Sequence, residues 1–363
     1  MTERVACIGY GALTPVGPSA SASYQAVREG NSALRPYEGM FGCKEPFVAS
    51  LFGQRDCLAD CSFLETIAIR SAREAIGAAG IDPSSSRVAF VFSSIKGNIE
   101  ALGREDVSLA VSAARIARFF QNPNVPLVVS NACISGLAAM VQGRRMLLSG
   151  RWNAVVVVGA EVQSRFIVTG FQSLKALSAA PCKPFDAERD GLNLGEAAAA
   201  MVLALSDQGW ELADGAIRND ANHISGPSRT GEGSYNALRY VLSSIAAEEL
   251  AFVNAHGTAT RYNDEMEAVA LGRAGLSGVP VNSLKGCFGH TMGAAGILES
   301  ILSMQACEEG LVLPTRGFSS LGVSEPLRVS AHAQPCTGRA FVKLLSGFGG
   351  VNGALLFKKG GVR

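Results

Sequence analysis

The chain has 363 residues, enough for two domains or one duplicated unit around a large core. It is 48% hydrophobic and 17% charged, which excludes a disordered chain. The net charge of +1 provides no global field that would attract nucleic acid or a membrane surface, so neither is an expected partner.

The nine cysteines lack the paired spacing of a zinc site, so we expect no metal. Their odd number fits reduced thiols, as in a cytosolic protein. The N-terminal segment shows no basic region followed by a long apolar run, and no stretch reaches membrane-spanning length. We therefore expect a cytoplasmic protein.

In the first half of the chain, apolar strands alternate with helical patterns, which indicates α/β architecture. The expected elements are a strand over 4–8, a turn over 9–15, a helix from 24, helices over 63–79 and 108–120, and strands over 87–92, 125–129 and 154–158. The run 125–129 has the β-branched bias of a buried strand, and 154–158 is typical of a central strand covered on both faces. From Ile134 onward the apolar residues recur at helical spacing.

The second half repeats the first weakly. Three short segments of the first half have counterparts in the same order: 89–92 with 251–254, 125–126 with 279–280, and 155–159 with 341–345. This pattern predicts two similar α/β halves packed as one body. The glycine-rich segment 346–353 then precedes a last apolar run, and it reads either as a simple hairpin turn or as a loop that points a backbone N–H into a crevice.

Cys133 lies between the strand 125–129 and the first turn of the helix that follows. The partial positive charge of a helix N-terminus favours a thiolate there. The alternative is an inert buried cysteine, because free cysteine is among the most buried residue types.

Two histidines follow other predicted strands. His256 follows the apolar run 250–253, and His290 precedes a helical segment over 297–306. Because strand ends gather in one crevice of such a sheet, we expect Cys133 and both imidazoles to meet. A thiol that holds an acyl group, with two N–H donors for a developing negative oxygen, suits acyl transfer coupled to enolate formation. Either histidine alone could equally be a core or turn residue, and His223 and His332 lack this context.

In combination, these motifs resemble the β-ketoacyl-acyl carrier protein synthases, the elongating two-histidine condensing enzymes of the thiolase superfamily. The resemblance extends from Val5 to Asn352 and rests on the Cys turn, His256-Gly-Thr-Ala-Thr with Asp264, Lys285-x4-His290 and the terminal Gly-Phe-Gly-Gly-x-Asn. It implies a thiolase-like fold of two similar halves in five layers, α-β-α-β-α. Residues 1–208 would carry the nucleophilic cysteine, and residues 209–363 would carry the two histidines.

The resemblance also implies roles for individual residues. Cys133 would be the nucleophile, its backbone N–H and that of Phe348 would form the oxyanion hole, and Phe348 would act as a gate. His256 and His290 would support decarboxylation of a malonyl thioester and stabilise the enolate. Lys285 would organise the site electrostatically, paired with Glu299. The matching motif residues that would support the site are Thr258, Thr260, Asp264 and Asn352.

In this family the chemistry is an acyltransferase reaction, a decarboxylative Claisen condensation that needs no metal or organic cofactor. The implied partners are acyl- and malonyl-loaded acyl carrier proteins. The implied assembly is a homodimer in which strands containing Val155 pair, or a heterodimer with a related subunit. A basic patch should meet the acidic carrier, and four arginines on predicted helices are candidates unless they are merely solvated: Arg115, Arg118, Arg144 and Arg145.

Four features depart from the family pattern: Gly195-Glu-Ala-Ala-Ala, Ser346, Val351 and a compact segment over 96–124. They favour a specialised polyene or polyketide pathway over bulk fatty acid synthesis and leave the acyl chain length open. One alternative function is a non-catalytic partner like the chain-length-factor subunits, although those typically lack the nucleophile. A degradative thiolase would need a second cysteine near the C-terminus in a Cys-x-Gly setting, and the terminal glycine-rich motif has none.

Overall fold

The computed structural model describes residues 4–360, and the ends of the two expected halves, residues 1–3 and 361–363, lie outside the described residues. The chain up to residue 205 forms β1 (Val5–Leu13), α1 (Ala20–Arg28), β2 (Leu34–Tyr37), β3 (Phe47–Ser50), α2 (Phe63–Ala79), β4 (Val88–Ser93), α3 (Leu109–Phe119), β5 (Leu127–Val129), α4 (Ser135–Leu148), β6 (Ala154–Glu161), α5 (Arg165–Ser173), β7 (Leu194–Gly195) and β8 (Ala197–Leu205). The rest forms β9 (Trp210–Asn219), α6 (Glu232–Val241), β10 (Leu250–Asn254), α7 (Arg261–Arg273), β11 (Pro280–Asn282), α8 (Lys285–Phe288), α9 (Ala295–Glu308), β12 (Leu311–Val312), β13 (Arg328–Val329), β14 (Gln334–Pro335), β15 (Ala340–Gly347) and β16 (Val351–Lys359).

An eleven-stranded sheet runs through both halves in the order β13-β11-β10-β15-β16-β9-β1-β8-β6-β4-β5. Apart from the short outer strand β13, the sheet repeats itself: β5-β4-β6-β8-β1 corresponds strand for strand to β11-β10-β15-β16-β9. The two sets join where β1 pairs with β9 at only two positions, Ala6 with Glu211 and Cys7 with Trp210. This repeated order confirms the expectation of two similar α/β halves. We propose that the halves divide in the turn between β8 and β9, as the expected boundary at 208 implies.

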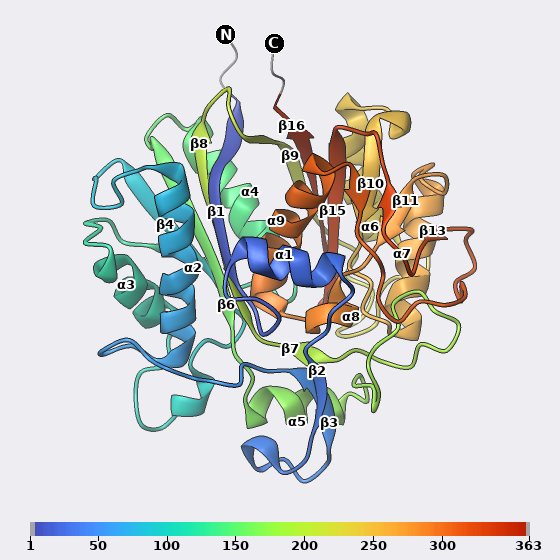
Figure 1. Ribbon diagram of the computed structural model, residues 1–363, viewed down its shortest axis with the longest axis horizontal. Coiled ribbons are helices and arrows are strands. Elements are labelled where there is room, and N and C mark those ends of the chain that lie inside the picture. Colours follow the sequence, from blue (N-terminus) through green and yellow to red (C-terminus); the bar gives the residue numbers. More distant parts are fainter. Residues whose placement is uncertain (1–3, 361–363) are drawn as a thin grey trace.

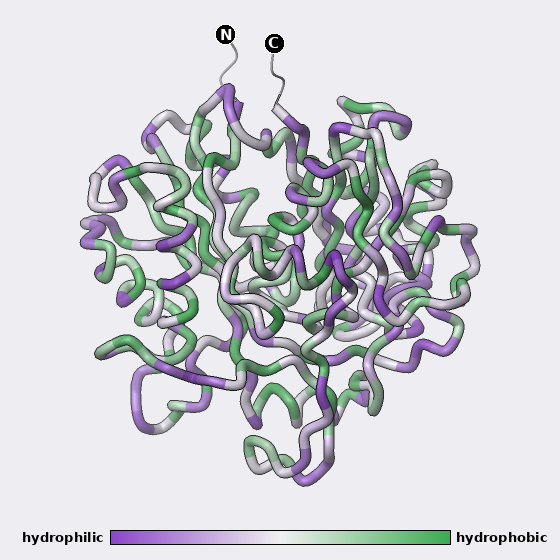
Figure 2. Tube along the Cα trace, in the orientation of Figure 1, coloured by the Kyte–Doolittle hydropathy of each residue, from purple (hydrophilic) through white to green (hydrophobic). Residues whose placement is uncertain are grey.

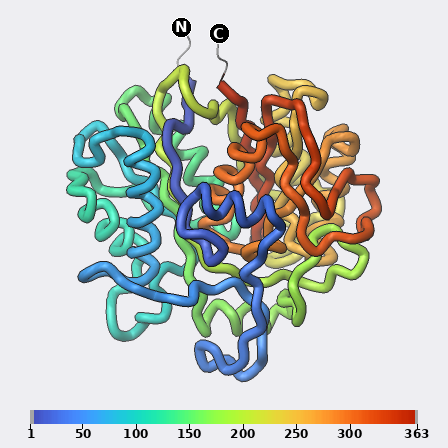
Figure 3. Tube along the Cα trace, viewed as in Figure 1, coloured from blue at the N-terminus to red at the C-terminus, as the bar shows by residue number. Residues whose placement is uncertain are grey.

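The layers alternate as helices, sheet, helices, sheet and helices (Figure 1). Helix α2 packs on β1, β8 and β6, and α6 covers β9 and β16 on the other side. Between the two sets of strands, α4 contacts β6 and β16, and α9 contacts β8 and β15. Figure 3 shows that the blue-to-green first half and the orange-to-red second half lie mostly on opposite sides of this central pair of helices. The five-layered architecture is therefore the one expected.

The core follows from hydrophobic patterning. Figure 2 shows hydrophobic residues concentrated on the strands and the inner helices, and hydrophilic ones on outer loops. All eight residues of β6 are buried, as expected for a strand covered on both faces. Helix α2 spans the predicted 63–79, and its first turn is closed by a capping box between Ser62 and Glu65.

The predicted turn over 9–15 is wrong for most of its length, because β1 continues to Leu13. The glycines at 9 and 11 lie where this strand touches α2: a Cβ on Gly9 would lie 2.4 Å from the carbonyl oxygen of Ala75. They allow close contact between strand and helix, which a local reading takes for a turn signal.

Two expectations about the strands near Cys133 are also wrong. β5 is an edge strand and not a buried one: Val125, just before it, is 94% exposed and Leu127 is 38% exposed. β6, which contains Val155, pairs with β4 on one edge and with β8 on the other, so it has no free edge for a second subunit. The free edge of this half of the sheet belongs to β5.

Across residues 4–360, no helix combines the length and the apolar character that crossing a lipid bilayer requires. All nine cysteines lie in this part of the chain and are free thiols, as expected.

Candidate active site

Cys133 occupies a tight turn between β5 and α4. The residue before it, Ala132, has a left-handed backbone with φ of 45°, which is uncommon outside glycine and turns the chain sharply. Ser135 stabilises the turn: its hydroxyl donates to the carbonyl oxygen of Ala132 at 2.6 Å and accepts the N–H of Asn131 at 2.8 Å. The sulfur is thereby held at the start of α4, and the side chain is only 7% exposed.

His256 follows β10, and a buried carboxylate fixes its backbone. Glu267 of α7 accepts the N–H of His256 at 2.6 Å and that of Gly257 at 2.7 Å. Asp264 braces the next residues by accepting the N–H of Ala259 at 3.2 Å. The expected supporting residue Asp264 therefore acts on the backbone of this turn.

His290 lies between α8 and α9, and the first half of the chain holds it. Its backbone N–H donates to the carbonyl oxygen of Asn193 at 2.7 Å, and its carbonyl accepts the N–H of Gly195 at 3.0 Å. Its Nδ1 accepts the N–H of Met292 at 3.2 Å, which leaves the proton of a neutral ring on Nε2.

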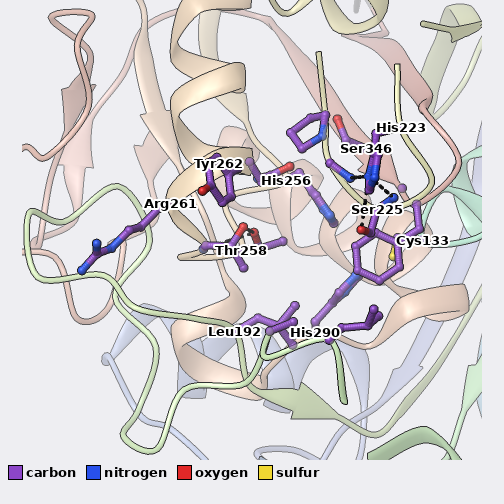
Figure 4. Close-up of a pocket in the computed structure, with 18 of the residues that line it drawn as sticks. Cys133, Leu192, His223, Ser225, His256, Thr258, Arg261, Tyr262, His290 and Ser346 are labelled. Carbon is purple, nitrogen blue, oxygen red and sulfur yellow. Dashed lines mark hydrogen bonds between the residues drawn. The ribbon is translucent and has the colours of Figure 1, made fainter. Parts of the chain in front are cut away.

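The three side chains converge in space. The sulfur of Cys133 and one ring nitrogen each of His256 and His290 all lie within 4.8 Å of one another, although these residues are far apart in sequence. The rings meet edge to face with centroids 4.9 Å apart. All three line one cavity of about 500 Å³, together with Thr258, which lies nearby in Figure 4. Such sulfur and nitrogen donors could also bind a soft metal ion, which would occupy the thiol.

Two ring nitrogens are buried without a hydrogen-bond partner in the described chain: Nδ1 of His256 and Nε2 of His290. Burial lowers the pKa of both imidazoles well below 6.5, and the charge of Lys285 lowers each further. Both rings are therefore neutral near pH 7. An unpartnered buried polar group in a cavity is available to a ligand.

The expected thiolate is wrong for the resting pocket. Burial raises the pKa of Cys133 to about 11, although Lys285 and the backbone N–H groups of Phe348 and Cys133 act in the opposite direction. The negative charge of Glu161 adds to the increase. At pH 7 the sulfur therefore carries its proton.

A buried cluster of three charged side chains lies among these segments. Glu299 of α9 binds Lys285 through Oε1 at 2.8 Å, as expected, and binds Lys343 of β15 through Oε2 at 2.6 Å. All three are almost fully buried. Burial alone would raise the pKa of Glu299, but the two lysines hold it below its usual value.

The remaining expected residues also lie at the cavity. Thr258 and Thr260 line it, and their hydroxyls lie 2.9 Å apart. Asn352 accepts the hydroxyl of Ser346 at 2.8 Å, and its amide donates to Asp220 at 3.2 Å. Ser346 of β15 is thus hydrogen-bonded to the residue directly opposite it on β16.

Phe348 lies at the tip of the β15–β16 hairpin and is 37% exposed. Its ring stacks on that of Phe171 of α5, with centroids 5.8 Å apart. The glycine-rich segment is a hairpin turn, and the backbone N–H of Phe348 acts to lower the pKa of Cys133.

The four candidate arginines do not act as one free patch. Arg115 pairs with Glu65 at 3.3 Å, and Arg144 donates to the carbonyl oxygens of Leu212 and Ala213. Among basic residues, Lys175 and Arg261 line the cavity, and Figure 4 shows Arg261 extending away from the imidazoles.

Sequence reasoning missed two residues. His223 lines the cavity, in a turn after β9, and its Nδ1 accepts the N–H of Gly226 at 3.1 Å. The sequence gives no signal for this turn, because β9 mixes polar and apolar residues without a clear strand pattern. Lys343 had a usable signal, since a charged residue within an apolar strand is rarely buried without a partner.

Comparison with known proteins identifies the class. The N-terminal domain of the β-ketoacyl synthases matches residues 2–208, and the C-terminal domain of the same family matches residues 210–319. The chain therefore belongs to the β-ketoacyl synthase family of condensing enzymes.

Individual relatives are similar over almost the whole chain. The 3-oxoacyl-[acyl-carrier-protein] synthase 2 of Vibrio cholerae is 27% identical over 98% of this chain and 99% of its own. The actinorhodin polyketide putative β-ketoacyl synthase 1 of Streptomyces coelicolor is 28% identical over 99% of this chain and 89% of its own. A solved β-ketoacyl synthase from Burkholderia phymatum superposes with a TM-score of 0.89 at 25% identity, covering both chains fully.

Proposed function

We propose that this protein is a 3-oxoacyl-[acyl-carrier-protein] synthase, which joins an acyl group held on Cys133 to a malonyl group carried on acyl carrier protein. The observation that carries the proposal is the approach of the thiol and two neutral imidazoles to within 4.8 Å in one cavity. The product would serve fatty acid synthesis or a specialised polyene or polyketide pathway. The polyketide synthase relative supports the polyketide setting about as strongly as the 3-oxoacyl-[acyl-carrier-protein] synthase 2 relative supports fatty acid synthesis, because their identities to this chain are 28% and 27%.

In the first step the sulfur of Cys133 attacks the carbonyl carbon of the acyl thioester. A new C–S bond forms, the bond to the carrier thiol breaks, and the thiol proton passes to the leaving sulfur. The backbone N–H groups of Cys133 and Phe348 both act to lower the pKa of this thiol, which supports their proposed role as donors to the oxyanion that forms between these events.

In the second step the malonyl thioester loses carbon dioxide. The electron pair of the broken C–C bond moves onto the α-carbon and the thioester oxygen, giving an enolate. Neutral imidazoles of His256 and His290 donate hydrogen bonds to that oxygen, and the proton on Nε2 of His290 follows from its contact with Met292.

In the third step the enolate carbon attacks the acyl carbonyl on Cys133. A C–C bond forms, the C–S bond breaks, and the released sulfur takes up a proton to restore the thiol. These steps need no redox partner, because the electron pair that forms the new bond comes from the carboxylate that leaves.

We also propose a two-subunit assembly, either a homodimer or a heterodimer with a related subunit. The support is the unpaired outer edge of β5, next to the exposed Val125. Among solved structures, the ishigamide ketosynthase/chain length factor is similar at 25% identity with a TM-score of 0.87. The carrier would approach the cavity mouth, where Lys175 and Arg261 offer positive charge to an acidic partner.

The test is intact-mass analysis after incubation with a set of acyl-loaded carrier proteins and, separately, with acyl coenzyme A. We expect one acyl adduct on the wild-type protein from a carrier-bound donor and none on Cys133→Ala. The exposed Cys57 provides the control, because Cys57→Ala should keep the adduct. An absence of adduct from every donor would favour the non-catalytic partner subunit, and an adduct from coenzyme A alone would favour a thiolase-like reaction.

A further inference from the structure

Lys343 is a cation buried at the centre of the protein. It lies in β15 between Val342 and Leu344, and its side chain is 0% exposed. It shares a face of the strand with Phe341 and Leu345, which belong to the apolar core around α9. An isolated ammonium at such a position would be very unfavourable, so its contacts show what it does.

The ammonium of Lys343 has three acceptors. It donates to the carbonyl oxygens of Asn254 at 3.3 Å and Ala255 at 3.0 Å, the two residues before His256. Its third bond goes to Oε2 of Glu299, whose other oxygen holds Lys285. Lys343 therefore links the His256 turn to the Glu299–Lys285 pair, whose two members lie on either side of His290 in the sequence.

Stability gives no reason for this arrangement. Bringing three charged groups out of water costs desolvation free energy, and apolar replacements of similar volume are often neutral or stabilising. The cluster also has an excess of one positive charge, because two lysines pair with the single carboxylate of Glu299. A buried cluster with an excess positive charge beside two imidazoles points to the chemistry of the site.

We propose that Lys343 is a positioning residue for the decarboxylation step, which fixes the His256 turn against the Glu299–Lys285 pair and keeps the charge beside both imidazoles positive. This inference rests on the proposed function. It concerns the second and third steps, because Lys343 has no hydrogen bond to the turn that holds Cys133.

The charge has a predictable effect on the imidazoles. The charged groups that face Lys343 are Glu299, Lys285 and Glu267, and the charge of Lys343 in turn lowers the pKa of both His256 and His290. A protonated imidazole would pair with the malonyl carboxylate and oppose its loss. Protonation at Nδ1 of His290 would also break the bond from Met292.

The experiment compares Lys343→Met, Lys343→Arg and the wild-type protein. Methionine keeps the approximate length without charge or donors, and arginine keeps the charge. Lys358→Met is the matched control, since Lys358 lies on the neighbouring strand β16 near the surface and its ammonium donates to the carbonyl oxygen of Ser244 at 3.3 Å. Three quantities are measured: the Cys133 acyl adduct by mass, carbon dioxide release from malonyl carrier protein against pH, and the unfolding temperature.

We expect Lys343→Met to form the adduct and to release carbon dioxide about ten- to a hundredfold more slowly, the scale of a misplaced catalytic group. Removing the positive charge raises the imidazole pKa, so the acid limb of the pH profile should move upward by about one unit. Lys343→Arg should restore the wild-type limb even at a lower rate, and Lys358→Met should match the wild type throughout.

A Lys343→Met protein with wild-type decarboxylation and an unmoved limb would overturn the proposal. If Lys343→Met does not fold, Lys343→Arg decides alone. Because arginine keeps the positive charge, an acid limb displaced upward by about one pH unit in Lys343→Arg would contradict the proposal. Failure of the proposed function is distinguishable, because the wild-type protein would then form no adduct and release no carbon dioxide.

Discussion

The carboxylate of Glu161, at the end of β6, accepts the backbone N–H of Gly293 at 2.9 Å, three residues after His290. The same side chain accepts the hydroxyl of Ser94 at 2.9 Å and the N–H of Ile95 at 3.0 Å. Burial raises its pKa to about 7 despite these donors. A single side chain from the first half therefore helps to fix the position of the second imidazole.

Replacing Glu161 with glutamine should destabilise the protein by about 2–4 kcal/mol, because an amide nitrogen would face backbone donors that need an acceptor. Carbon dioxide release should fall as well, since His290 loses a support. Chemical denaturation measures the first effect. The exposed Glu100→Gln is the control and should change stability by less than about 0.5 kcal/mol; equal stability of the two variants would contradict the prediction.

The protonated thiol of Cys133 predicts a steep pH dependence of its alkylation. With a pKa of about 11, its thiolate fraction rises about tenfold per pH unit, so labelling by iodoacetamide should increase about a hundredfold between pH 7 and 9. Peptide mass spectrometry of the Cys133 peptide follows the rate, with Cys133→Ala as the blank. A plateau already reached near pH 8 would show a thiolate favoured by the helix terminus instead.

The two inner helices touch at glycine. A Cβ on Gly136 of α4 would lie 2.8 Å from the carbonyl oxygen of Gly293, just before α9, and 3.4 Å from the nitrogen of Gly296 in α9, whereas one on Gly77 of α2 would meet nothing within 4 Å. Gly136→Ala should therefore cost about 1–3 kcal/mol, and Gly77→Ala should stabilise the protein by about 0.5–1 kcal/mol. Thermal unfolding of both variants tests the pair, and shifts of the same sign would refute this account.

The free edge of β5 predicts where two subunits meet. A lysine in place of Leu127 would put a charge on the pairing edge, so Leu127→Lys should shift the protein toward monomer. Tyr240→Lys, on the exposed side of α6, is the matched control and should leave the assembly unchanged. Sedimentation velocity measures both, and a wild-type monomer would remove the basis for this assembly.

The sequence predicts a helix or strand well where the periodicity and the capping residues lie in or next to that segment. The helix over 63–79 has its periodicity and its cap within the segment, so its bounds were found. The prediction that 125–129 is a buried strand is wrong because an edge strand and a central strand can have the same apolar residue types. The sequence around Gly9 predicts a turn because the helix that Gly9 contacts in space, α2, is more than fifty residues away in the sequence.

In the site, too, the sequence predicts what depends on local residues and misses what depends on contacts between distant segments. Residue types and their place after strands were enough to bring Cys133, His256 and His290 together. The ionisation of Cys133 was misjudged because it depends on burial by segments far along the chain, which outweighs the adjacent helix terminus. The apolar strand around Lys343 indicates that this lysine has a partner, but the sequence does not identify the partner, because Glu299 and the carbonyls before His256 are brought close only by the sheet and α9.

The joint between β1 and β9, only two residue pairs wide, has a practical consequence. The exposed turn at 207–209 is a natural place to cut the polypeptide, and the resulting pieces would separate the sulfur from both imidazoles. Neither fragment could then perform the condensation, so recovered turnover on mixing would report directly that the two had docked.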